Sequence, residues 1–310
     1  METRQAIRSF LLDREARNRS PETIDWYRRK LKPFAEMYEE LPEEPTPIRE
    51  FMRDLAGLAD VTKHGYYRAL QALYNFVHLE WGFPLDREVK NLEANPIRKV
   101  GAPVVRPKAM RSLSLEGLHR LLSASHDSRE RKWALRDRVI LGLFSDTGAR
   151  LGEIASLTWP NVNDETIYVT GKTGEQEKPL SPELRLLLTS LRRWNDANFG
   201  PSDHVFLGKR GTPLTKQGVQ EVVERWFKRA GFTGPRCSPH TLRHTFGRNW
   251  IAEGGDQFTL QRILGHTTMQ MVQRYVDMNL KETIRQHRRF SPFRTQARMA
   301  QGSLLEEATV

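Results

Sequence analysis

A proline-rich basic segment near residue 100 divides the chain into two regions. Residues 95–112, NPIRKVGAPVVRPKAMRS, hold three prolines, one glycine and five Lys or Arg, with almost no apolar periodicity. Such a segment does not continue a helix and is typical of a linker. The 310-residue chain is long enough for two ordinary domains. We therefore expect a first domain at 1–95, a basic linker at 96–111, and a second domain with a terminal tail at 112–310.

The charge of the chain indicates the kind of partner. Forty-nine Lys and Arg against 38 Asp and Glu give a formal charge of +11 and a pI near 9.9. This excess favours a polyanion, because each phosphate that is neutralised releases condensed counterions. Charge alone does not distinguish DNA from RNA or from an acidic membrane surface.

Several other classes of protein are disfavoured by the sequence. The longest strongly apolar run, 139–144, is far shorter than the roughly 20 residues of a membrane span. The N-terminus is charged throughout and lacks a signal-peptide pattern, so we expect a cytoplasmic protein. The single cysteine, Cys237, excludes an internal disulfide, and CSPH at 237–240 offers at most two of the four ligands of a structural zinc site. We expect no metal and no cofactor.

The first region predicts a bundle of four short-looped helices. Ser20-Pro21 is an N-cap followed by proline at the first helical position, and Thr46-Pro47 repeats the signal. Basic side chains occupy the exposed helix positions at Arg28, Arg29, Lys30, Lys32, Lys63, His64 and Arg68. They fit either an ordinary solvated face or a surface that contacts phosphates, and the net charge favours the second interpretation.

The second region predicts helices with a small antiparallel sheet inserted. Residues 136–144 read as a buried helix, residues 166–170 as a strand, and 177–180 can pair back across a turn at 171–174. Further helix starts are indicated at Ser114, Ser181-Pro182, Thr215 and Pro239. The fold class is therefore mainly α with a small antiparallel β-sheet.

A set of basic, histidine and tyrosine residues is distributed along this second region. It comprises Arg150 in TGARLGE, Lys172 in GKTG, His240 and Arg243 in HTLRH, His266 in LGH, and Tyr275 nine residues further on. Each also has an ordinary structural interpretation. Arg150 can pair with Glu153, Lys172 can be a solvated turn residue, and His240 and Arg243 can be a first-turn histidine and a surface cation. His266 can be a cap residue, and Tyr275 can pack in the core.

In this order and at these separations, the motifs resemble the catalytic domain of the tyrosine recombinase (phage integrase) family. The resemblance covers residues 112 to about 290 by motif. The N-terminal bundle resembles the SAM-like core-binding domain of the same family by architecture alone. The resemblance implies two domains that form a C-shaped clamp on duplex DNA.

The chemistry of these residues suits a phosphodiester. The guanidinium groups of Arg150 and Arg243 can clamp the non-bridging oxygens and stabilise the charge that develops on them, without a metal. Tyr275, with a usual pKa of about 10, requires activation before it attacks. The resemblance implies that His240 accepts its proton and that His266 contacts the phosphate or orients the attack. Lys172 is suited to protonate the leaving 5′ oxygen. The products are a 3′-phosphotyrosine and a free 5′-hydroxyl. Because the covalent link stores the bond energy, the reaction can be reversed with the 5′-hydroxyl of a second DNA without ATP.

Two neighbouring residues, His244 and Lys178, are interpreted as structural, and Met269, Met271 and Val272 are expected on the buried side of the helix that carries Tyr275. Ala149, Gly152 and Asn249-Trp250 depart from the usual family pattern and weaken an assignment to the Xer branch. The ending MVQRYVDM favours an integrase of a mobile element that performs integration or excision.

Other functions stay open. These are Xer-like resolution of chromosome or plasmid dimers, type IB topoisomerase-like DNA relaxation, a non-catalytic DNA-binding protein, and a metal-dependent nuclease or transposase. The expected partner is double-stranded DNA with specific recombination sites. We expect no association with a membrane. The resemblance and the tail SLLEEATV at 303–310 favour a homotetramer on two sites. A monomer is possible in the absence of DNA. An accessory DNA-bending protein is also possible.

Overall fold

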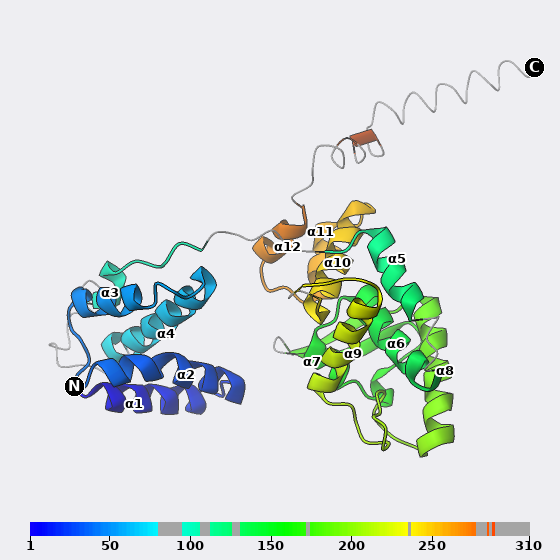
Figure 1. Cartoon of the computed structure of the whole chain (residues 1–310), viewed down its shortest axis with the longest axis horizontal. Coiled ribbons are helices and arrows are strands. Elements are labelled where there is room, and N and C mark those ends of the chain that lie inside the picture. Colours follow the sequence, from blue (N-terminus) through cyan, green and yellow to red (C-terminus); the bar gives the residue numbers. More distant parts are fainter. Residues whose placement is uncertain are drawn as a thin grey trace, which may run out of the picture. The chain divides into compact units, whose positions relative to one another are not determined.

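The computed structural model describes residues 1–79, 95–105, 112–125, 131–171, 174–234, 237–276, 284 and 287–288. The chain divides into two compact units, Met1–Lys108 and Ala109–Val310. Lys172, residues 106–111 of the expected linker and the expected tail at 303–310 lie outside the described residues. Figure 1 labels the helices of both units.

The described part of the first unit contains four α-helices, α1 Thr3–Ala16, α2 Pro21–Met37, α3 Pro45–Asp54 and α4 Asp60–Leu79. The predicted cap at Ser20 is confirmed, since its side chain accepts a hydrogen bond from the backbone N–H of Thr23. The predicted cap at Thr46 is wrong. Helix α3 already begins at Pro45, whose fixed φ suits the first helical position, and Glu44 precedes it.

The core of the first unit extends into the segment expected to be a linker. Residues Pro96–Lys99 form a short 3₁₀ helix, and Ile97 is fully buried in the core of the helical bundle. Asn95 holds this turn, because its side chain accepts from the backbone N–H of Ile97 and donates to Asn75. The start of the expected linker, 96–99, is thus packed into the first unit, because its one large apolar residue finds a buried position.

The second unit contains most of the remaining elements. Its helices are α5 Leu115–Ala124, α6 Arg131–Thr147, α7 Leu151–Ala155, α8 Pro182–Phe199, α9 Lys216–Arg229, α10 Pro239–Ala252, α11 Gln257–Leu264 and α12 Met269–Val276, with a 3₁₀ turn at Trp159–Asn161. The strands β1 Thr166–Gly171 and β2 Gly174–Pro179 form an antiparallel hairpin in which Ile167 pairs with Lys178 and Gly171 with Gly174. The predicted fold class, mainly α with a small antiparallel sheet, is confirmed.

Two apolar clusters organise the second unit. The larger surrounds the buried face of α6 and includes side chains from α8, α9 and the hairpin. The smaller joins α10, α11 and α12, which pack together at one end of the unit (Figure 1). Val272 is fully buried in this cluster as predicted, but Met271 is 43% exposed, so its predicted burial is wrong. Among the described residues, no helix combines the length and the apolar character needed to cross a membrane.

Candidate active site

Arg150 stands at a break between two helices. Helix α6 ends at Thr147 and α7 begins at Leu151, so Arg150 is the N-cap residue of α7. Its backbone N–H donates to Glu153 Oε2 at 2.8 Å, and its Nη1 donates to Glu153 Oε1 at 2.7 Å. Glu153 is buried, whereas the side chain of Arg150 is 27% exposed. The carboxylate therefore holds Arg150 from inside the protein and leaves part of the guanidinium accessible.

The carboxylate of Glu153 keeps its charge despite its burial. Burial alone would raise the pKa of Glu153, but the hydrogen bonds from Arg150 and the charge of Lys178 outweigh it and lower that pKa. Glu153 Oε2 lies 3.9 Å from Lys178 Nζ. Glu153 is thus an ionised link between two cations, one at the surface of the site and one beneath it.

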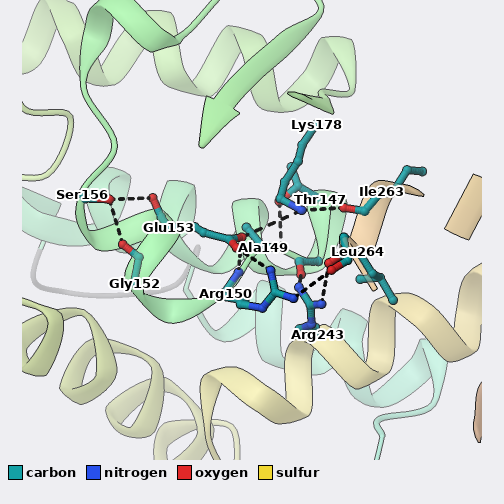
Figure 2. Close-up of polar contacts among 12 residues, drawn as sticks. Thr147, Ala149, Arg150, Gly152, Glu153, Ser156, Lys178, Arg243, Ile263 and Leu264 are labelled. Carbon is teal, nitrogen blue, oxygen red and sulfur yellow. Dashed lines mark hydrogen bonds and ion pairs between the residues drawn. The ribbon is translucent and has the colours of Figure 1, made fainter. Parts of the chain in front are cut away.

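Three cations converge on the C-terminal end of α11. Lys178 Nζ donates to the carbonyl of Ile263 at 2.5 Å and Arg243 Nη2 to that of Leu264 at 2.7 Å (Figure 2). Arg150 Nη2 donates to the carbonyl of Gly265 at 3.1 Å. The last carbonyls of a helix lack intrahelical partners and carry the negative end of its dipole. Three consecutive carbonyls at this helix end therefore fix the positions of the three cations.

The turn after α11 depends on a glycine. Gly265 adopts the left-handed conformation, with φ of 63°, and ends the helix. A Cβ at this position would overlap the side chain of Gln176 on β2. This turn delivers His266 directly after the carbonyls that bind the cations.

Arg243 is the most enclosed of the two arginines. Its side chain is 5% exposed, and Nη1 donates to the carbonyl of Gly148 at 2.6 Å. Burial and the charge of Arg150 lower the pKa of Arg243 to about 10, against the opposing effects of Tyr275 and Glu153. Arg243 therefore remains a cation at neutral pH.

Lys178 is a buried lysine that the sequence did not single out for the site. Its side chain is fully buried, opposite Ile167 in the hairpin. Burial, together with Arg243 and Arg150, lowers the pKa of Lys178 to about 8, while Glu153 acts in the opposite direction. Its ammonium group binds the carbonyl of Ile263 in the last turn of α11, which agrees with the structural role expected for it.

The two predicted catalytic histidines differ in their surroundings. His240 lies in the first turn of α10 with an exposed side chain, and loss of solvent around its ring and the charges of Arg243 and Arg150 lower its pKa. Burial and the nearby charges of Arg243 and Arg150 lower the pKa of His266 to about 4. Within the described residues, Nδ1 of His266 is buried without a hydrogen-bond partner. Both rings are neutral at neutral pH, and each can donate one hydrogen bond and accept another.

Tyr275 lies in the small apolar cluster on α12. It is 6% exposed, and its ring is nearly parallel to that of His266, with 6.2 Å between centroids and 8° between planes. Its hydroxyl lies 3.0 Å from Nδ1 of His244. The core-packing and the functional interpretations of Tyr275 are thus compatible, because the ring is buried while the hydroxyl contacts a histidine.

A cleft of about 440 Å³ in the second unit brings three of the predicted residues together, Arg150, His240 and Arg243. Tyr275 and His266 do not line this cleft. His244 lies between His240 and Tyr275: its ring stacks on that of His240 with centroids 6.1 Å apart, and its Nδ1 contacts the Tyr275 hydroxyl. Lys172 lies outside the described residues.

The cleft also contains two side chains from α9 that the sequence did not indicate. Lys216 and Gln220 line it from the first turns of α9, which begins after the cap residue Thr215. Their four-residue spacing places them on one face of the helix, a signal present in the sequence but without a motif to mark it. Among the described residues, no group of three or more His, Cys, Asp or Glu side chains could hold a metal ion.

The arrangement suits the binding of a phosphate. Arg150 and Arg243 each use two of their five N–H donors in the bonds above, and the donors that remain can reach an anion in the cleft that both line. Because the protein fixes both guanidinium groups beforehand, they can stabilise charge on a phosphoryl oxygen without rearranging.

Comparison with known proteins adds independent information. Residues 111–282, more than half of the chain, match the phage integrase family model. The tyrosine recombinase XerC of Thermodesulfovibrio yellowstonii is 26% identical over 279 residues, which cover 86% of this chain and 88% of the relative.

Solved structures share the fold at lower identity. The Tn1549 transposon integrase in complex with a circular intermediate DNA has a TM-score of 0.70 at 17% identity, covering 94% of this chain and all of the other. A lambda integrase tetramer bound to a Holliday junction has a TM-score of 0.67 at 19% identity, covering 86% of this chain and 78% of the other. With its family model matched over more than half of its length, the chain belongs to the phage integrase family of tyrosine recombinases.

Proposed function

We propose that the protein is a site-specific DNA recombinase that cuts and rejoins duplex DNA through a 3′-phosphotyrosyl intermediate at Tyr275. The observation that carries this proposal is the fixed pair of guanidinium groups. Arg150 and Arg243 are held on consecutive carbonyls at the end of α11 and line one cleft. A phosphodiester bound between them would meet two preorganised cations, which favours attack at phosphorus.

The proposed reaction assigns a role to each residue. The phenolate oxygen of Tyr275 attacks phosphorus, the bond from phosphorus to the 5′ oxygen breaks, and Arg150 and Arg243 stabilise the charge on the non-bridging oxygens. Lys172 delivers a proton to the leaving 5′ oxygen. The family resemblance assigns the proton of Tyr275 to His240, which lines the cleft, and His266, beside the Tyr275 ring, contacts the phosphate or orients the attack. A 5′-hydroxyl from a second DNA reverses these steps and completes strand exchange.

The proposed partner is duplex DNA bound by both units. The charge of +11 supports this, since phosphate contacts release counterions. The lambda integrase structure shows a tetramer on a Holliday junction, and we extend this assembly to the present chain as a homotetramer on two sites. We place the protein in the cytoplasm, on DNA.

Two biological roles fit this chemistry. Integration or excision of a mobile element is supported by the ending MVQRYVDM and by the shared fold with a transposon integrase. Resolution of chromosome dimers is the second candidate, because relatives named XerC match most of the chain. Recombination of plasmids that carry either the DNA flanking the gene or the host dimer-resolution site separates these two roles.

The proposed function is tested with nicked duplexes that trap the covalent complex. Duplexes from the DNA flanking the gene, each with a nick near the cleavage position, are incubated with protein in EDTA. Wild-type protein is expected to form a covalent adduct, and Tyr275→Phe none. Tyr168→Phe is a matched control, because this tyrosine is 43% exposed on the hairpin. An adduct from Tyr275→Phe, or an EDTA-sensitive one, would exclude the mechanism. Relaxation of supercoiled DNA that lacks any recombination site would instead support the topoisomerase alternative.

A further inference from the structure

The hydroxyl of Tyr275 contacts a histidine that lies outside the motif positions assigned to catalysis. His244 Nδ1 lies 3.0 Å from the phenol oxygen, and the two ring centroids are 5.9 Å apart. His244 is half-buried on α10, whereas Tyr275 belongs to α12. The contact therefore joins the proposed nucleophile to the helix that carries Arg243.

The backbone of α10 provides a seat for the ring of Tyr275. A Cβ built on Gly247 would lie 2.8 Å from Cε1, 2.9 Å from Cζ and 3.0 Å from Cδ1 of Tyr275. A real Cβ atom essentially never lies within 3.0 Å of another heavy atom, so the ring occupies space that only glycine leaves free. Gly247 lies three residues after His244 and therefore on the same helix face. Two positions one turn apart on α10 thus define where the ring and its hydroxyl lie.

The surroundings of the hydroxyl distinguish the two histidines of α10. His240 is four residues before His244, lines the cleft with Arg150 and Arg243, and stacks on the His244 ring. His244 does not line that cleft. His240 is therefore the histidine that lines the cleft, and His244 is the one that contacts the phenol.

We propose that His244 is a further catalytic residue of this reaction, the group that accepts the proton of Tyr275 while Gly247 seats its ring. This rests on the proposed function. In the step, the phenol proton moves to Nδ1 of His244, the freed electron pair of the oxygen forms the bond to phosphorus, and the bond to the 5′ oxygen breaks. His244 becomes an imidazolium and returns its proton to the phenol oxygen when the second DNA displaces Tyr275. His240 then serves the phosphate rather than the nucleophile, which changes the role expected for it from the sequence.

The test measures single-turnover formation of the covalent adduct on the nicked duplexes. Proton transfer by a positioned side chain contributes roughly 10²–10⁴-fold, so His244→Ala is expected to slow cleavage by at least about 100-fold. Added imidazole is expected to restore part of the rate. His244→Asn keeps a hydrogen-bond acceptor near the Nδ1 position but not a base, and is expected to remain slow. His119→Ala is the matched control, since this histidine is exposed on α5.

The outcomes separate this inference from the proposed function. A wild-type adduct at Tyr275 together with His244→Ala or His244→Asn cleaving within about twofold of wild type would overturn the role of His244 alone. No adduct from wild type, or an adduct from Tyr275→Phe, would overturn the function instead. DNA binding and thermal melting of each variant identify losses that come from misfolding.

Two further measurements address the contact directly. In protein with ¹⁵N-labelled histidine, Tyr275→Phe is expected to shift the Nδ1 resonance of His244 and not that of His119, and an unchanged His244 resonance would overturn the inference whatever the activity. Gly247→Ala is expected to slow cleavage, whereas Gly57→Ala, whose added Cβ meets nothing within 4 Å, is not. Equal cleavage by the two glycine variants would contradict the seat on α10.

Discussion

Replacement of Lys178 by methionine should change how the stability of the protein depends on pH. Burial lowers the pKa of Lys178 from 10.5 to about 8 in the folded protein. Below pH 8 the lysine is charged in both the folded and the unfolded chain, and its burial costs about 3 kcal/mol of stability. Above pH 8 the folded protein releases the proton while the unfolded chain keeps it until about pH 10.5. Stability therefore rises with pH in this window.

The expected size of this effect follows from the two pKa values. Between pH 7 and pH 10, the free energy of unfolding of wild type should rise by about 2.5 kcal/mol relative to Lys178→Met. Taking the difference between the two proteins removes the contribution of other titrating groups. Urea titrations followed by tryptophan fluorescence suit this measurement, because five of the seven tryptophans belong to the second unit: Trp133, Trp159, Trp194, Trp226 and Trp250.

A control and a refuting result complete this experiment. Lys209→Met removes an exposed lysine of the same unit and should leave the pH dependence as in wild type. If wild type and Lys178→Met show the same change in stability from pH 7 to pH 10, Lys178 is not buried as a charged group. The support of the α11 carbonyls by three cations would then be wrong.

Two other predictions concern the same helix end. Arg243 binds the carbonyls of Gly148 and Leu264 at the same time, which the single ammonium group of Arg243→Lys cannot reproduce. Single-turnover cleavage should therefore fall about 10²–10³-fold, with DNA affinity within a few fold of wild type. Cleavage near the wild-type rate would contradict the fixed clamp. Gly265→Ala places a Cβ beside Gln176 at a residue with left-handed backbone, and should lower the free energy of unfolding by about 1–2 kcal/mol or more. Urea denaturation measures this change. An unchanged midpoint would show that this turn is not constrained as described.

Local sequence signals predicted much of the fold. The caps at Ser20, Ser114 and Ser181 are confirmed, because a serine before a helix start accepts a hydrogen bond from the helix itself and needs no distant partner. The hairpin was predictable for the same reason, since glycines frame its turn at Gly171 and Gly174. These features depend on residues a few positions apart.

The contacts that organise the site depend on partners far along the chain. The strand β2, GEQEKP, has no apolar alternation, so only its pairing with β1 shows that Lys178 faces inward. Backbone carbonyls hold Arg150, Lys178 and Arg243, and because every residue type has the same carbonyl, the side chains do not show which ones bind. His244 could have been suspected from its four-residue spacing to His240, but its contact with Tyr275 requires the packing of α12 on α10.

The central claim is that Tyr275 becomes joined to the 3′ end of cleaved DNA between the two fixed arginines. The most direct measurement is mass spectrometry of the trapped adduct after digestion with protease and nuclease, with enzymatic labelling of the released 5′ end. We predict a nucleotide on the peptide that contains Tyr275, and a free 5′-hydroxyl that a polynucleotide kinase labels without prior dephosphorylation. A nucleotide on any other residue, or a 5′-phosphate on the released strand, would contradict the account.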